Sequence, residues 1–198
     1  MKKFLLTALL LLPAPVLAVD GVVLINQATI TAAGGFPYTL AQPGSYKLSG
    51  NLAVPANTNG IVIAVNNVTL DLGGFSITTP PPVVVPPFTT GIRSNGGTVS
   101  SAVTIKSGTI RGFTNPIEPG GDTTFWRLED LVLDSAIPAG GTVSMDLGSY
   151  TRVWHVTAFQ VNVNVLCPSV VTETMANAIG IPPGTPGNCA FVSNATVH

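Results

Sequence analysis

A short pattern of apolar and small residues recurs along most of this chain. Each copy has an apolar residue, a second apolar or small residue three positions later, and a third two positions after that. Successive copies begin 35, 23, 25, 18 and 20 residues apart. The copies are Leu70/Gly73/Phe75, Ile105/Gly108/Ile110, Leu128/Leu131/Leu133, Val153/Val156/Ala158, Val171/Thr174/Ala176 and Phe191/Asn194/Thr196. A repeat of this period is typical of stacked supersecondary units rather than of a globular core closed by distant contacts.

Between the turn signals, the chain reads as a series of short strands. The segments alternate apolar and polar residues or are continuously apolar, as β-strands are. They are residues 22–25, 45–48, 60–65, 68–72, 103–105, 125–133, 143–147 and 153–163. No stretch after residue 18 has sustained helical periodicity, although residues 172–180 are compatible with one helical turn. The sequence therefore predicts an all-β fold.

Residues 1–18 are predicted to be a secretory signal peptide. Lys2 and Lys3 precede an apolar run over residues 4–12, and Ala18 provides the small residue at which such peptides are cut. The run is too short for a spanning helix with anchoring flanks. The alternative is an uncleaved membrane anchor. We expect cleavage after Ala18, a secreted, periplasmic or cell-surface location, and no membrane insertion after cleavage.

The remaining chain is predicted to form one stack with a covered first end. Residues 19–50 are expected to be an N-terminal cap, because the first unit of a stack otherwise exposes a strand edge and an open core. Residues 51–198 are expected to form the coils. The Pro-rich segment 78–88 cannot be an inner strand, because proline donates no ladder hydrogen bond. We interpret it as an excursion from one coil; the alternative is a linker between domains.

The charge content excludes two classes of partner. Only 9% of residues are charged, against about a quarter in an average protein. After cleavage, nine acidic and six basic residues would remain, a net charge of about −3. No basic patch suits nucleic acid, and no polybasic stretch suits an anionic membrane.

Two cysteines are separated by about one repeat. Cys167 and Cys189 would lie on neighbouring coils of a stacked fold, and export would expose them to an oxidising compartment. We expect a structural disulfide; the alternative is two buried thiols. The only histidines that could complete a zinc site with these cysteines are His155 and His198, and this is a poor set of zinc ligands. Neither a metal nor another cofactor is therefore expected.

The repeat also aligns the residues that face outward. One position after the first pattern residue, consecutive coils carry Asp71, Lys106, Glu129, Trp154 and Thr172. Two positions after it, the last coils carry Asp130, His155 and Glu173. One position before it stand Arg127 and Arg152, and six positions after it Arg111 faces Asp134.

Two interpretations of these outward residues compete. The favoured one is that Asp71/Lys106/Glu129 and Arg111/Asp134 are surface charge ladders, worth about 0–1 kcal/mol for each exposed pair. The other is a catalytic or binding site. There Asp130, His155 and Glu173 would stack as a proton-transfer group. Arg127 and Arg152 would hold an acidic sugar, and Trp154 would stack on a sugar ring. Glu173 has the weakest alignment of these residues.

The chain resembles secreted bacterial right-handed parallel β-helix proteins of the pectate-lyase-like superfamily, in their repeat-containing group of uncharacterised members. The resemblance covers most of residues 38–197. It is carried by 43–48 (Pro-Gly-Ser-Tyr-Lys-Leu), 59–61 (Asn-Gly-Ile), 67–75 (Asn-Val-Thr-Leu-Asp-Leu-Gly-Gly-Phe), 107–113 (Ser-Gly-Thr-Ile-Arg-Gly-Phe) and 193–195 (Ser-Asn-Ala). It implies a right-handed parallel β-helix, a solenoid of about six coils with an N-terminal cap strand. The family's polygalacturonase motifs Asn-x-Asp, Asp-Asp, Gly-His-Gly and Arg-x-Lys are absent, and His155 stands in Trp-His-Val.

Three functional hypotheses follow from the sequence. The leading one is a secreted scaffold without enzymatic activity that binds polysaccharide or associates with itself end to end. The second is a small polysaccharide lyase or glycoside hydrolase that uses the Asp130/His155 face. The third is an end-fragment of a larger β-helix assembly, since the chain stops at His198 directly after a strand signal. The sequence identifies no substrate.

Overall fold

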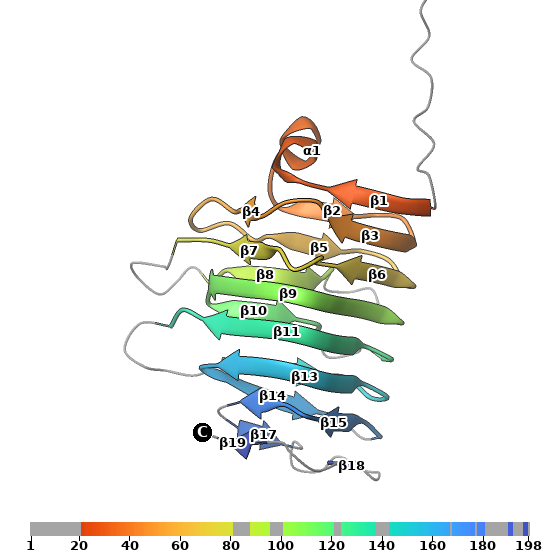
Figure 1. Ribbon diagram of the computed structural model, residues 1–198, viewed down its shortest axis with the longest axis vertical. Helices are drawn as coiled ribbons and strands as arrows, with labels where there is room; N and C mark the ends of the chain where they lie inside the picture. Colours follow the sequence, from red (N-terminus) through yellow and green to blue (C-terminus); the bar gives the residue numbers. More distant parts are fainter. Residues whose placement is uncertain are drawn as a thin grey trace, which may run out of the picture.

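The protein is a stack of parallel strands, seen in a computed structural model (Figure 1). The structure describes residues 21–80, 88–95, 101–120, 124–137, 143–166, 168–176, 178–180, 190–191 and 196–197. The predicted signal peptide, Cys167, Cys189, His198 and residues 81–87 of the Pro-rich segment lie outside these residues. Among the described residues the chain is all-β, with one short helix.

The largest sheet runs the length of the stack. Its main path is β1 (Val22–Ile25), β3 (Gly44–Leu48), β6 (Val68–Asp71), β9 (Val103–Phe113), β11 (Arg127–Ser135), β13 (Arg152–Phe159), β15 (Val170–Thr172) and β18 (Ala190–Phe191). The short strands β4 (Leu52–Ala53), β7 (Ser76–Thr78), β16 (Met175–Ala176) and β19 (Thr196–Val197) extend the same sheet. Each strand pairs in parallel with a strand about one repeat away.

Two further parallel sheets accompany the first. One has the order β10 (Asn115–Glu118), β8 (Thr90–Ser94), β5 (Ile61–Ile63) and β2 (Tyr38–Leu40). The other has the order β12 (Val143–Leu147), β14 (Val161–Val165) and β17 (Ala178–Gly180). Long parallel sheets whose strands pair one repeat apart are compatible with a parallel β-helix.

The recurring pattern of the sequence marks the inside of the stack. Leu128 pairs in register with Ile105 and Val153, and all three are fully buried. Burying one side chain of this size contributes about 1.5–3 kcal/mol. The same positions stack from rung to rung, so one core runs along the column.

A left-handed residue explains why the pattern has a spacing of three and then two. Side chains of a strand alternate between its faces, so Leu128 and Leu131 would normally face opposite ways. Asp130 lies between them with φ 52°, and this bend turns Leu131 back into the core. Ser107, His155 and Glu173 have φ values of 60°, 51° and 47° at the same point of their rungs.

The structure corrects the pattern at both ends. Ile77, rather than Phe75, pairs with Ile110, because the Gly73-Gly74 turn inserts two residues into that coil. In the last copy, the sequence pattern predicted that Thr196 would pair with Ala176. Val197 pairs with Ala176 instead, and Thr196 pairs with Met175.

Two secondary-structure predictions were wrong. Residues 172–180 contain the end of β15, β16 and β17 rather than a helical turn. The predicted strand 153–163 is two strands, β13 and β14, separated by Gln160 at φ 55°.

The helix α1 (Gln27–Ala32) was not predicted from the sequence. Asn26 caps it: its side-chain oxygen accepts from the Thr29 amide at 2.9 Å, and the Thr29 hydroxyl accepts from the Asn26 amide at 2.8 Å. Ile30 of this helix is fully buried, and α1 lies at the N-terminal end of the column (Figure 1). No helix in the described part of the chain is long and apolar enough to cross a membrane.

Close packing between rungs gives the first testable prediction. A Cβ at Gly91 would come within 2.5 Å of Ile110 Cγ2 and 2.6 Å of the Pro116 carbonyl oxygen. Gly91→Ala is therefore expected to lower the free energy of unfolding by about 1–3 kcal/mol. Denaturant unfolding of Gly50→Ala is the matched control, because a Cβ there meets nothing within 4 Å. Equal stability of the two variants would contradict the packing of β8 described above.

Candidate functional site

The left-handed bend of the large sheet collects polar side chains at one corner of the stack. Asp130 in β11, His155 in β13 and Glu173 directly after β15 occupy this bend on consecutive rungs, as the repeat predicted. A left-handed conformation costs an ordinary residue about 1–2 kcal/mol, so the bend is retained at an energetic cost.

The predicted trio is divided between two interactions. His155 Nδ1 lies 2.6 Å from Asp130 Oδ1, and both side chains are substantially exposed. Glu173 does not join them: its Oε2 accepts a hydrogen bond from Trp154 Nε1 at 3.1 Å. The structure therefore forms an aspartate–histidine pair, with Glu173 holding the neighbouring indole.

Two arginines stand side by side next to this corner. Arg127 and Arg152 are register partners on β11 and β13, and both are exposed. Arg152 lies 5.8 Å from the centre of the Trp154 ring, within the range of a cation–π contact. Within the described part of the chain, neither guanidinium makes an ion pair or a hydrogen bond. Like charges directly opposite each other destabilise a sheet.

An exposed aromatic pair, which the sequence reasoning missed, precedes the two arginines. The rings of Phe125 and Tyr150 are stacked, with centroids 4.9 Å apart and planes inclined by 17°. Both residues are left-handed, with φ of 57° and 58°, which is unusual for bulky side chains. More than half of each is exposed. The signal was present as Phe125-x-Arg127 and Tyr150-x-Arg152 at equivalent points of two repeats.

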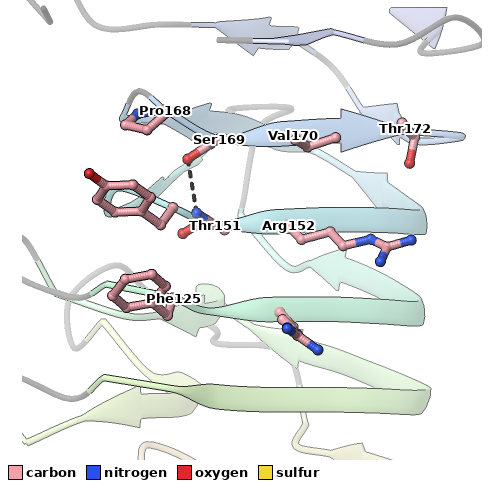
Figure 2. A pocket seen from close by; sticks show the side chains of 9 residues that line it. Phe125, Thr151, Arg152, Pro168, Ser169, Val170 and Thr172 are labelled. Atoms are coloured by element: carbon pink, nitrogen blue, oxygen red, sulfur yellow. Dashed lines mark hydrogen bonds between the residues drawn. The ribbon is translucent and has the colours of Figure 1, made fainter. Parts of the chain in front are cut away.

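These side chains line one open groove. Its volume is about 570 Å³, and it crosses β11, β13 and β15. Figure 2 shows Phe125, Arg152, Val170 and Thr172 along it, on successive rungs. The floor is fixed by Ser169 Oγ, which accepts a hydrogen bond from the Thr151 amide at 3.0 Å. The groove therefore has aromatic rings at one side and guanidinium groups beside them. The lining residues are Phe125, Arg127, Tyr150, Thr151, Arg152, Pro168, Ser169, Val170 and Thr172.

The predicted charge ladders are formed in part. Arg111 and Asp134 pair at 3.2 Å, as the register predicted. Lys106 is in register with Asp71 and Glu129 but forms no ion pair with any described residue. Asp71 is instead 3.7 Å from Lys47, on the rung before it.

No cluster of three or more His, Cys, Asp or Glu side chains suited to a metal ion occurs among the residues with described positions. The predicted disulfide between Cys167 and Cys189 concerns residues outside the described part.

No protein-family model matches the chain, and neither a curated protein nor a solved structure matches it significantly.

The Asp130–His155 pair should contribute little to folding. Their side chains are 44% and 65% exposed, so a double-mutant cycle with Asp130→Ala and His155→Ala is expected to give a coupling free energy of at most about 1 kcal/mol. Chemical denaturation of the two single variants and the double variant measures it. A second double-mutant cycle on the exposed Arg111–Asp134 ion pair gives the reference coupling free energy. A coupling of several kcal/mol would show that the pair is a structural element of the corner.

Proposed function

We propose that the chain is a secreted right-handed parallel β-helix of about six coils, related to the pectate-lyase-like superfamily. Support comes from the long parallel sheets, from strand partners one repeat apart, and from the left-handed bend that recurs on successive rungs. The apolar leader with Lys2 and Lys3 supports export. On this scaffold, the exposed side chains rather than the fold determine the function.

The function that the groove across β11, β13 and β15 supports best is the binding of an acidic polysaccharide, without catalysis. The observation that carries this proposal is the unpaired Arg127–Arg152 couple beside the stacked rings of Phe125 and Tyr150. An acidic group placed between the two guanidinium groups would relieve their repulsion and accept bidentate hydrogen bonds.

The aromatic pair would supply the apolar half of the recognition. Rings of Phe and Tyr present large, rigid surfaces on which the apolar faces of sugar rings can pack. Asn67 and Ala102 have the same left-handed φ at the equivalent point of earlier rungs, so this turn belongs to the coil, and the coil places the two rings beside each other. The Trp154 indole, held by Glu173, extends the same surface beyond Arg152.

A second candidate function is polysaccharide cleavage by a lyase or hydrolase. The specific observation in its favour is the 2.6 Å contact between His155 Nδ1 and Asp130 Oδ1. Such a contact orients an imidazole and leaves Nε2 to exchange a proton with a substrate. Release of reducing ends or unsaturated sugars that disappears in His155→Ala would establish this function in place of binding alone.

The binding function predicts a measurable affinity for acidic glycans. In calorimetry at low salt, the protein is expected to bind polygalacturonate, alginate or hyaluronate. Arg127→Gln and Arg152→Gln should each weaken binding about tenfold to a hundredfold, because each removes charge-assisted hydrogen bonds worth about 1.5–3 kcal/mol. Tyr150→Ala should weaken it by a similar factor. Affinity should fall as salt rises.

Lys106→Gln is the matched control, because it removes one cation of the same sheet outside the groove. It should leave the affinity within about twofold of the native value. If no acidic polysaccharide binds, or if Lys106→Gln weakens binding as much as Arg152→Gln, the groove is not the binding site.

A further inference from the structure

A second groove lies on a different sheet of the stack. It has a volume of about 460 Å³ and opens over β8 and β10, with Asn59 before β5 at its edge, in the sheet of order β10, β8, β5 and β2. Its lining residues are Asn59, Phe88, Thr90, Arg93, Asn115 and Glu118. None of them belongs to the groove proposed above for acidic glycans.

A chain of hydrogen bonds fixes the polar side chains of this second groove. Asn59 Oδ1 accepts from the Thr90 amide at 2.8 Å, and the Thr90 hydroxyl donates to Glu118 Oε2 at 2.9 Å. These bonds connect three successive rungs through Thr90, which is 3% exposed. Arg93 Nε donates to the Ser94 carbonyl oxygen at 3.3 Å, which directs the guanidinium along its own strand.

Several polar atoms of the groove have no partner within the described residues. They are Glu118 Oε1, Asn59 Nδ2, the terminal guanidinium nitrogens of Arg93 and the side-chain amide of Asn115. Arg93 and Glu118 are register partners on β8 and β10, yet no ion pair joins them. The set therefore offers donors and acceptors together, on fixed supports and with no net charge.

We propose that this groove binds a neutral sugar ring, as a saccharide site separate from the acidic-glycan groove. Sugar hydroxyls both donate and accept, so they match a mixed set of amide, guanidinium and carboxylate groups. Phe88, 64% exposed at the edge of the groove, offers an apolar surface for the ring face. Glu118 disfavours an acidic sugar, because it would place a second negative charge in the same groove.

Neutral oligosaccharides test this site. Hexaoses of β-1,4-glucose, β-1,4-xylose, β-1,4-mannose and β-1,3-glucose are titrated into the full chain by calorimetry and by NMR of the side-chain amides. At least one is expected to bind and to shift the Asn59 and Asn115 amide signals. Asn115→Ala should weaken that binding about threefold to tenfold. It removes an amide that holds no other part of the described chain, so folding should be retained.

Glu118→Gln and Arg127→Gln provide the separating controls. Glu118→Gln keeps an acceptor for Thr90 but removes the charge-assisted bond to a hydroxyl, so it should weaken the neutral sugar about tenfold. Arg127→Gln should leave it unchanged. If no hexaose binds, or if both Asn115→Ala and Glu118→Gln bind as the native chain does, the second site is disproved. Polygalacturonate binding, measured on the same samples, tests the first groove independently.

Discussion

The left-handed residue within each long rung is the constraint on which the rest of the structure depends. A regular strand would send the second and third pattern residues to the face opposite the first, so the three could not all lie in the core. The bend at Asp130 and His155 restores the inward direction of Leu131 and Val156. Because the bend recurs at the same point of each rung, the strands remain in register along the column. The bend also fixes where a polar corner appears on the outside.

Stacking in parallel register has opposite consequences inside and outside the column. Inside, it places apolar residues on apolar residues, which is what a core requires. Outside, it places each residue beside its counterpart one repeat away, whether or not they attract. Phe125 and Tyr150 gain from this arrangement by stacking, whereas Arg127 and Arg152 place two like charges on neighbouring rungs. A parallel stack thus turns any repeated outward residue type into a linear array, and unfavourable arrays are informative because folding alone does not explain them.

The sequence predicted the large sheet well because one periodic signal determines both the inward and the outward positions. The alignment of Glu129 with Lys106 and Trp154 followed from it directly. The periodic signal gave a wrong residue where a coil has extra residues that its composition does not reveal. The Gly73-Gly74 turn lengthens one coil by two residues, so Ile77 rather than Phe75 takes the inward position. The helix α1 is too short to show a period. The sequence could not predict which side chains bond to each other. The register places Glu173 beside both His155 and Trp154, and only the side-chain rotamers decide which of the two it contacts.

The two grooves differ in a way that follows from their sheets. Across β11 and β13 the register partners are two arginines, so the groove repeats one charge from rung to rung. Across β8 and β10 they are an arginine and a glutamate, so the charges cancel. Rungs of parallel strands lie about 4.8 Å apart, and the side chains of one column share that spacing. A polymer that crosses β11 and β13 meets a guanidinium group on each of these two rungs, which suits a ligand with acidic groups on neighbouring units. A single neutral ring needs no such array. The second groove offers it amide, guanidinium and carboxylate groups around one position instead.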